Sequence, residues 1–337
     1  MLPLLVRRPD VRVTVLADTD KAARARAVSR AVGARVEPSW QAALASADLD
    51  AVVVTLPTAL HAEVALAAIA RGVAMYLEKP LASTLEAATA VRDAARASPL
   101  TIAVGFNSRF HPLLVRMRDQ LRDSRIGEPR MVRCAFTVAA RYEGSWRHHA
   151  SDGGGVLHDL ASHHADLIRY LLGREVLRVS ALRAIQPDGS EALAAAGELE
   201  GGVLLSATWA SGTIDDDVVE VVGTNGALRL SRYESLDLSH RGRAASGLAT
   251  RVAQALPTPG KAAFSLARRR APWHDPSFAA ALDHFIVAAR GRSAVVPGVD
   301  EGWHSARVVA AIAEAARSGG TVSLDWRTDT HVDLAHR

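Results

Sequence analysis

One stretch of the chain, Gly153–Asp166, combines glycines, carboxylates and histidines at a spacing that could support acid–base chemistry. Its three leading glycines permit a tight turn, and the mixture of polar and apolar residues after them predicts the start of a helix. Asp159 and His163 are four residues apart, so on a helix both project from the same face. A carboxylate beside an imidazole can fix the ring tautomer and tune its basicity, as a general acid or base requires. A helix start with an internally bonded histidine and a solvated carboxylate fits the same spacing, and both interpretations stay open.

A metal site is a second interpretation of the histidines in this region. Five residues there are of types that bind zinc: His148, His149, His158, Asp159 and His163. Asp159 and His163 supply only two of the three or four ligands that zinc needs, so we expect no metal. The single cysteine, Cys134, excludes an internal disulfide and a cysteine-based zinc cage.

Lysine is rare in this chain and therefore informative. It occurs only at positions 21, 79 and 261, and arginine makes up the rest of the 40 basic residues. A desolvated lysine can give up its proton near neutral pH, whereas arginine cannot, so Lys79 is a candidate for chemistry. It lies in the sequence Glu78-Lys79-Pro80 after an apolar run, where a plain turn with a proline exit is the alternative.

The elements that must position these residues alternate in type over the first third of the chain. We expect strands at 11–17, 34–37, 51–56, 73–77 and 101–105, separated by helices at 21–32, 40–47, 61–71 and 85–97. Strands that alternate with helices of this length predict βαβ units and a parallel sheet.

From residue 106 the pattern changes. After a helix at 112–122 and the central glycine stretch, we expect mainly strands, a long loop at 240–275, helices at 278–290 and 302–317 and a strand at 321–324. Consecutive strands without intervening helices predict a mostly antiparallel sheet. Because 337 residues exceed one comfortable core, we predict an α/β protein of two domains: a Rossmann-like domain at 1–105 and an α/β domain with a large open sheet at 106–337.

The position of Asp18 indicates which nicotinamide cofactor the chain prefers. It stands at the end of the strand at 11–17, where dinucleotide-binding domains place the acid that binds the adenosine ribose hydroxyls. A carboxylate there repels a 2′-phosphate, which favours NAD over NADP. Asp18-Thr-Asp20 also precedes a helix, so Asp18 could instead be the N-cap of that helix.

Composition limits the other partners. The net charge is only +4, aromatic residues make up 5% of the chain, and the densest basic cluster, Arg268–Arg270, fits a solvated loop, so we expect no nucleic-acid partner. No uncharged apolar run reaches the roughly 18 residues of a membrane span, so we expect no membrane partner. The chain opens without a basic and apolar leader, which favours a cytoplasmic protein.

Several motifs together resemble the Gfo/Idh/MocA family, the glucose–fructose oxidoreductase and inositol dehydrogenase group. The matching segments are Thr55-Leu-Pro57 with His61, Glu78–Pro80, Val104–Pro112, Ile126–Pro129, Gly153–Asp166 and Glu220–Gly226. Each motif is weak alone, but the ordered set spans almost the whole chain. The family often has glycine at the position of Ala161. The resemblance implies a nucleotide-binding domain and a second α/β domain whose open sheet forms a homodimer or homotetramer.

The resemblance also implies a function: an NAD(P)-dependent oxidoreductase that transfers hydride between a nicotinamide and a secondary alcohol or ketone of a sugar, cyclitol or related polyol. The implied catalytic residues are Lys79, Asp159 and His163; His163 or Lys79 would be the direct base, and Lys79 could stabilise the developing alkoxide. Candidate cofactor-binding residues are Asp18, Thr55, Pro57, His61, Glu78, Lys79 and Asn107. His61 could equally be a helix-end residue without a ligand. Candidate substrate-binding residues are Asn107, Tyr142, Trp146, Arg147, Asp159 and His163.

The start of the chain departs from the family pattern. No G-x-G-x-x-G occurs there, and residues 2–8 fit the end of the first helix, so we expect the first strand and its glycine-rich loop to be missing. That strand is central in the usual order 3-2-1-4-5-6, and each buried unpaired backbone group costs about 1–3 kcal/mol. Three explanations stay open: the functional protein begins upstream, the chain is a degenerate homologue, or the strand at 11–17 pairs directly with that at 51–56. The degenerate case favours a different function, a weakly active or inactive ligand-binding or regulatory protein.

Overall fold

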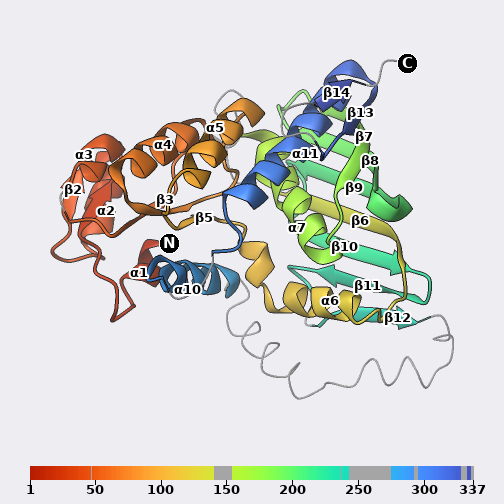
Figure 1. The fold of residues 1–337 in the computed structure, drawn as a ribbon, viewed down its shortest axis with the longest axis horizontal. Helices are drawn as coiled ribbons and strands as arrows, with labels where there is room; N and C mark the ends of the chain where they lie inside the picture. The colour runs from red at the N-terminus through yellow and green to blue at the C-terminus, as the bar shows by residue number, and fades with distance from the viewer. Residues whose placement is uncertain are drawn as a thin grey trace. The chain divides into compact units, whose positions relative to one another are not determined.

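The computed structural model describes residues 1–46, 48–139, 154–235, 237–242, 275–291 and 295–327, and the backbone of 332–334. Two units are formed (Figure 1): unit 1 is Met1–Gly105 with Phe278–Trp303, and unit 2 is Phe106–Ser277 with His304–Arg337. Residues 278–303, which we expected in the second domain, thus belong to unit 1. Aromatic packing contributes to this difference, because the Phe285 and Tyr76 rings pack edge-to-face with centroids 5.8 Å apart.

Unit 1 contains short parallel strands joined by helices, as the sequence predicts. Its elements are α1 (Leu2–Leu5), β1 (Val15–Ala17), α2 (Lys21–Val28), β2 (Arg35–Glu37), α3 (Trp40–Leu44), β3 (Ala51–Val54), the 3₁₀ turn η1 (Thr58–Leu60), α4 (His61–Arg71), β4 (Ala74–Leu77), α5 (Leu85–Arg96), β5 (Ile102–Val104), α10 (Ser277–Ala289) and the start of α11 (Val299–Ser318). β1 and β2 form one parallel sheet, and β3, β4 and β5 form another in that order. No hydrogen-bonded ladder joins β1 to β3 in the described residues, so direct pairing of these strands, one of the three explanations left open for the missing first strand, is wrong.

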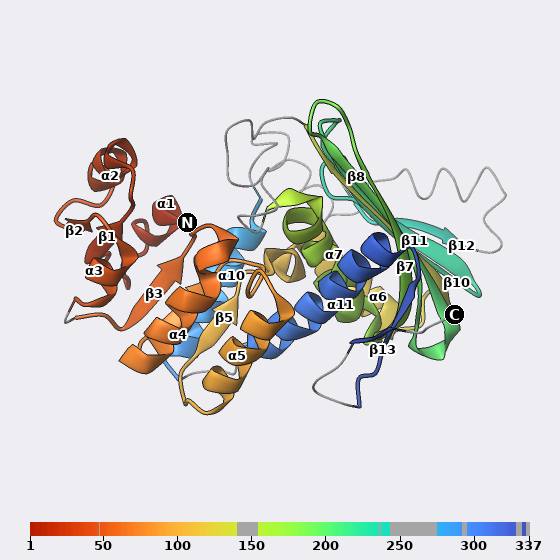
Figure 2. The same cartoon turned by 90° about the horizontal axis from the view of Figure 1, so that it is seen from above.

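Helices cover both faces of the three-stranded sheet. α4 and α5 pack side by side on one face, and α10 lies on the other (Figures 1 and 2). Every residue of β4 and β5 is buried as a result, which explains why both strands are continuous apolar runs.

The carboxyl ends of β3, β4 and β5 lie at one edge of this sheet. The Glu78 N–H donates to the Val54 carbonyl at 3.0 Å, and the Gly105 N–H donates to the Leu77 carbonyl at 2.7 Å. The turns that follow the three strands are therefore neighbours, at the edge where open parallel sheets bind ligands.

Unit 2 is built on one large sheet. Its elements are the 3₁₀ turn η2 (Asn107–Phe110), α6 (Pro112–Arg122), β6 (Pro129–Val138), the π turn η5 (Leu157–Ala161), α7 (Ser162–Leu172), β7 (Val176–Ile185), β8 (Glu191–Leu199), the 3₁₀ turn η6 (Glu200–Gly202), β9 (Val203–Ser211), β10 (Asp216–Gly223), β11 (Gly226–Ser231), β12 (Ser239–Gly242), the rest of α11, β13 (Thr321–Leu324) and β14 (Val332–Leu334). β12 falls at the start of the segment expected to be a loop.

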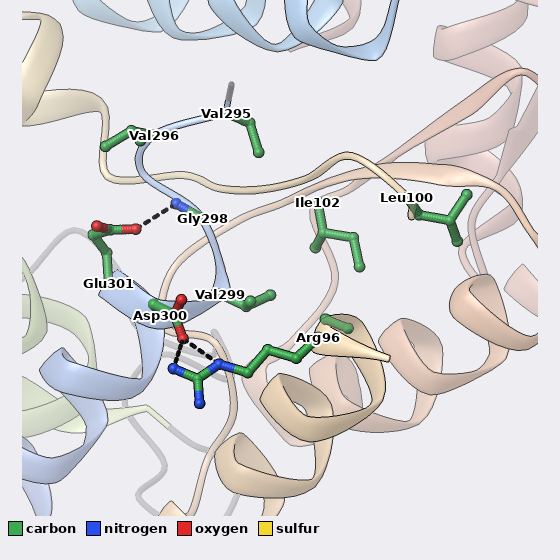
Figure 3. Close-up of a pocket in the computed structure, with 10 residues that line it drawn as sticks. Arg96, Leu100, Ile102, Val295, Val296, Gly298, Val299, Asp300 and Glu301 are labelled. Atoms are coloured by element: carbon green, nitrogen blue, oxygen red, sulfur yellow. Dashed lines mark hydrogen bonds and ion pairs between the residues drawn. The ribbon is translucent and has the colours of Figure 1, made fainter. Parts of the chain in front are cut away.

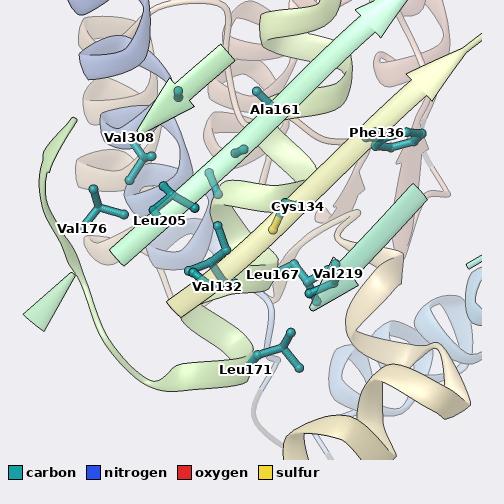
Figure 4. Close-up of a cluster of buried hydrophobic side chains, with 14 of the residues drawn as sticks. Val132, Cys134, Phe136, Ala161, Leu167, Leu171, Val176, Leu205, Val219 and Val308 are labelled. Atoms are coloured by element: carbon teal, nitrogen blue, oxygen red, sulfur yellow. The ribbon is translucent and has the colours of Figure 1, made fainter. Parts of the chain in front are cut away.

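The nine strands follow the order β12-β11-β10-β6-β9-β8-β7-β13-β14. Neighbours are antiparallel except β6 and β9, which are parallel, so the prediction of a mostly antiparallel sheet is confirmed. Figure 2 shows the sheet nearly edge-on with α6, α7 and the later part of α11 on one face. The core of unit 2 lies between these layers; Figure 4 shows Val132 and Cys134 of β6 close to Leu167 and Leu171 of α7. Among the described helices, none is long and apolar enough to cross a membrane.

Candidate active site

Three of the predicted cofactor-binding residues of unit 1 follow β1 and β3. Asp18 is exposed, and one of its carboxylate oxygens accepts the N–H of Asp20 at 2.8 Å. Asp20, whose side chain accepts the N–H of Ala22, is the N-cap of α2, so the N-cap interpretation of Asp18 is wrong. Thr55 is exposed and Pro57 is half-buried in the turn after β3. All three predicted residues therefore lie at the carboxyl ends of parallel strands.

Glu78 and Lys79 are half-buried in the turn after β4, and the Lys79–Pro80 peptide bond is cis. The end of β5 lies close to this turn. A Cβ atom added to Gly105 would come within 2.9 Å of the Glu78 carboxylate. Glycine at 105 thus allows Glu78 to lie across the end of β5.

His61 lies behind the same turn rather than facing solvent. It is the first residue of α4, and only 1% of its surface is exposed. Its Nδ1 lies 2.7 Å from the carbonyl oxygen of Pro80, and its Nε2 lies 2.9 Å from that of Leu56. A contact between His61 and a cofactor was our prediction, but both ring nitrogens face main-chain carbonyls.

The predicted helix after the glycines is present in unit 2. Asp159 lies in the π turn η5 and His163 in the first turn of α7, and both side chains are half-buried. The His163 ring lies next to Phe136 of β6, with ring centroids 6.0 Å apart. π turns inside helices are frequent at functional sites, and this one carries the predicted carboxylate.

The start of this helix is held by a residue that the sequence analysis missed. Glu191 of β8 is buried and accepts the N–H of Val156 at 3.0 Å, while Arg183 donates to its other oxygen. A carboxylate at a helix N-terminus satisfies an otherwise unpaired N–H and complements the helix dipole. Gly155, at φ +79°, makes the turn that brings Val156 to Glu191.

Asp166 is tied to the turn that carries Asn107. The Arg109 guanidinium donates to both Asp166 carboxylate oxygens, at 2.6 and 2.8 Å, and both side chains are buried. The Tyr170 hydroxyl donates to the Arg109 carbonyl at 3.0 Å, which joins α7 to η2 a second time. Asn107 is itself buried, and its Nδ2 donates to the Ser277 hydroxyl at 2.8 Å. A contact of Asn107 with nicotinamide or substrate stays a prediction.

A second buried polar chain runs beneath His163. Arg232 donates to Asp275 at 2.8 Å and to Asp217 at 3.1 Å, and Asp217 lies 3.0 Å from Nε2 of His164. Trp209 donates its indole N–H to Nδ1 of His164 at 3.1 Å, so Nε2 must carry the ring proton and donate to Asp217. Burial raises the pKa of Asp217, but its bonds with His164 and Arg232 outweigh that effect and hold the pKa below its usual range. His164 is thus a structural histidine beside the predicted catalytic one.

The alternation of residues in β10 could have predicted that Asp217 is buried. Asp217 is in phase with Val219 and Val221 of β10, which are buried. A carboxylate on the inward phase of a strand requires a buried partner. The sequence could therefore have indicated that Asp217 is paired, although not with which residue.

Some predicted residues lie outside the described part of the chain: Tyr142, Trp146, Arg147, His148 and His149. Among the described residues, no group of three or more histidine, cysteine or acidic side chains is arranged to hold a metal ion.

Unit 1 also has a pocket of about 300 Å³, lined by residues of α5, β5 and the segment around α11's start (Figure 3). Arg96 and Asp300 form an ion pair of 2.7 Å there, and Glu301 accepts the N–H of Gly298 at 2.8 Å. Ile102, which lines the pocket, is the first residue of β5, so the pocket lies at the amino end of the sheet. It is therefore separate from the predicted site, which lies at the carboxyl end.

Comparison with known proteins gives the class of the molecule. Residues 1–106 match the family model described as "Oxidoreductase family, NAD-binding Rossmann fold", and residues 114–229 match "GFO/IDH/MocA C-terminal domain". The protein is thus an NAD(P)-dependent oxidoreductase with a Rossmann-like first unit.

Individual relatives agree with both matches. The chain is 32% identical over 248 residues to the dTDP-3,4-didehydro-2,6-dideoxy-alpha-D-glucose 3-reductase of Streptomyces antibioticus. The aligned region covers 72% of this chain and 74% of the relative. The chain is also 32% identical to the inositol 2-dehydrogenase of Rhizobium meliloti (strain 1021), over 65% of this chain and 68% of the relative. The chain belongs to the Gfo/Idh/MocA family of oxidoreductases.

Solved structures share the fold. The WlbA dehydrogenase of Bordetella pertussis, in complex with NADH and UDP-GlcNAcA, has a TM-score of 0.81 at 21% identity and covers 96% of this chain and 93% of its own. A levoglucosan dehydrogenase in complex with NADH and levoglucosan has a TM-score of 0.78 at 22% identity and covers 95% of both chains.

Proposed function

We propose that this oxidoreductase acts on a secondary hydroxyl group, or the corresponding ketone, of a sugar, cyclitol or related polyol. The relatives named above are a deoxysugar reductase and an inositol dehydrogenase, both of which act on such groups. No observation favours the alternative of a ligand-binding or regulatory protein without turnover. The cytoplasmic location stays a prediction from the sequence.

The proposal depends most on one feature of α7. In the run from Ser162 to Ile168, His163 is the one side chain that is not buried. Its buried polar neighbours His164 and Asp166 bond Asp217 and Arg109. His163 is therefore the side chain of this run with surface accessible to a ligand, and Asp159, four residues before it, is also half-buried.

Each proposed catalytic residue has a distinct task. His163 removes the hydroxyl proton, and Asp159 orients the imidazole and stabilises the cation that forms. Lys79 donates a hydrogen bond to the developing alkoxide or relays the proton. A bound nicotinamide would accept the hydride. Lys79 belongs to unit 1 and the other two residues to unit 2, so their convergence on one carbon is part of the proposal.

The residues of unit 1 fit a nicotinamide dinucleotide. Asp18 follows β1 of one parallel sheet, and Thr55 and Lys79 follow β3 and β4 of the other, each beyond the carboxyl end of its strand, where Rossmann-type sheets bind a dinucleotide. We propose that Asp18 binds the ribose hydroxyls and favours NAD over NADP. Replacing Asp18 with serine should then narrow the difference in kcat/KM between NAD and NADP, while an unchanged ratio would contradict this role.

The activity test is reduction of NAD by the purified chain against a panel of polyols and cyclitols. The variants Lys79→Met and His163→Ala should lose at least about 100-fold in kcat, since each removes a group that acts in the transition state. Lys21→Met and His240→Ala are matched controls, because neither residue lies in the proposed site. Full activity of Lys79→Met or His163→Ala would show that the site is wrongly assigned.

We also propose that the open face of the nine-stranded sheet binds a second copy of the chain. Helices cover one face, and no described element covers the other (Figure 2). That face exposes Leu182 (76%), which lies opposite Ala194 of β8, and Leu204 (53%), which lies opposite Glu198 of β8. Leu204→Glu should reduce the mass in analytical ultracentrifugation, whereas Ile214→Glu, in the loop after β9, should not. A wild-type monomer would refute the proposal.

A further inference from the structure

The turn that carries Lys79 is anchored on both sides by main-chain hydrogen bonds. Before the lysine, the Glu78 N–H donates to the carbonyl of Val54 at the end of β3. After it, the Pro80 carbonyl oxygen lies 2.7 Å from Nδ1 of His61. The first anchor is an ordinary sheet bond, but the second depends on one side chain.

The same side chain also reaches the turn after β3. Nε2 of His61 lies 2.9 Å from the Leu56 carbonyl oxygen, so the ring bridges the turns that follow β3 and β4. Carbonyl oxygens only accept hydrogen bonds, and a neutral imidazole has one N–H to donate. Both bonds can form together only when the ring carries two protons. Burial lowers the pKa of His61, the two carbonyls oppose this, and the positive charge of Lys79 adds to the lowering. At neutral pH the ring is therefore neutral, and its one N–H donates to one of the two carbonyls while the other ring nitrogen faces the second.

These contacts leave the imidazole without a polar atom directed at a cofactor. One ring nitrogen faces the carbonyl of each turn, and 1% of the residue's surface is exposed. A buried bridge of this kind restricts the backbone of the residues it joins. Lys79 is adjacent to one of the two bonded carbonyls, so the position of its amine depends on the bridge.

We propose that His61 is a positioning residue for Lys79: it clamps the turn after β4 to the turn after β3 and so fixes the lysine at the carboxyl edge of the sheet. It acts through main-chain carbonyls and touches neither cofactor nor substrate. The inference rests on the proposed catalytic role of Lys79 and replaces our expectation that His61 binds the cofactor.

The kinetic test compares His61→Leu, which has no donor, with His61→Gln, whose amide can still donate. Glu63→Gln, an exposed substitution in the first turn of α4, is the matched control. Because a misplaced catalytic group costs about 10–100-fold, kcat should fall by that factor in His61→Leu and by less in His61→Gln. KM for NAD should stay within about twofold, since no binding contact is lost. A raised KM for NAD with unchanged kcat would overturn the proposal and restore a cofactor contact.

A second measurement needs no enzymatic activity. The chain has lysines only at 21, 79 and 261, so trace acetylation followed by mass spectrometry resolves each of them. The rate of Lys79 modification relative to Lys21 should change in His61→Leu, change less in His61→Gln and stay constant in Glu63→Gln. An unchanged ratio in folded His61→Leu overturns the proposal; if that variant fails to fold, an unchanged ratio together with an unchanged kcat in His61→Gln overturns it. If the wild type shows no dehydrogenase activity but the ratio changes, the clamp is correct and the proposed function is wrong.

Discussion

Replacing Asp166 with leucine should strongly destabilise unit 2. Arg109 and Asp166 bond through two contacts of 2.6 and 2.8 Å, and their side chains are only 7% and 2% exposed. The substitution keeps the number and branching of the side-chain heavy atoms but leaves a buried guanidinium without its counter-charge. Loss of one partner of a buried ion pair costs about 3–5 kcal/mol. At about 2–4 °C per kcal/mol for a unit of this size, the melting temperature should fall by roughly 10 °C.

Thermal unfolding monitored by circular dichroism measures this shift, and two further variants test its cause. Arg109→Met combined with Asp166→Leu should recover most of the loss, because two apolar side chains of similar volume leave no charge unpaired. Glu314→Gln breaks the exposed pair with Arg317 and should leave the melting temperature unchanged. If the double variant melts as low as Asp166→Leu alone, the unpaired charge is not the cause and the reasoning fails.

Three further outcomes are expected. Gly155→Ala should lower the free energy of unfolding, measured by urea titration, by more than about 1 kcal/mol, because φ is +79° and the new Cβ would lie 3.0 Å from the Glu191 carboxylate. An unchanged urea midpoint would contradict this. Burial raises the pKa of Asp217, but its bond with His164 contributes to a net lowering of that pKa below 3.8. The ionised carboxylate therefore stabilises the fold fully above pH 3.8, and this stabilisation is lost as the pH falls further. In a plot of melting temperature against pH, Asp217→Asn should make the decline at acid pH less steep. Burial raises the pKa of the Cys134 thiol, so a chromogenic disulfide reagent should react with it in urea and not in the native protein.

Periodicity and chain order predicted much of the fold. Alternating short apolar runs and helical segments gave the parallel strands of unit 1, and consecutive alternating segments gave the antiparallel sheet of unit 2. Residues 278–303 were misplaced because an amphipathic pattern marks a buried helix face without showing which sheet buries it. The parallel pairing of β6 with β9 was equally invisible, because alternation in a strand carries no information about its neighbours.

Residue type and spacing predicted a candidate site but not the residues that support it. The four-residue separation of Asp159 and His163 and the position of Lys79 after a strand were the signals, and the roles of these residues stay predictions. The role of His61 could not be read in the same way, because a histidine at the start of a helix has the same sequence pattern whether it meets a ligand or two carbonyls. Glu191 is distant in sequence from the helix that it caps, so no local pattern connects them.

The position of β6 in the large sheet has a consequence for how the protein forms. Both of its neighbours, β9 and β10, are synthesised after it, so β6 emerges from the ribosome with no strand to pair with. The antiparallel run of β7, β8 and β9 has short connections and can assemble by itself, which gives β6 its first template. Until then its apolar side chains stay exposed to non-native contacts.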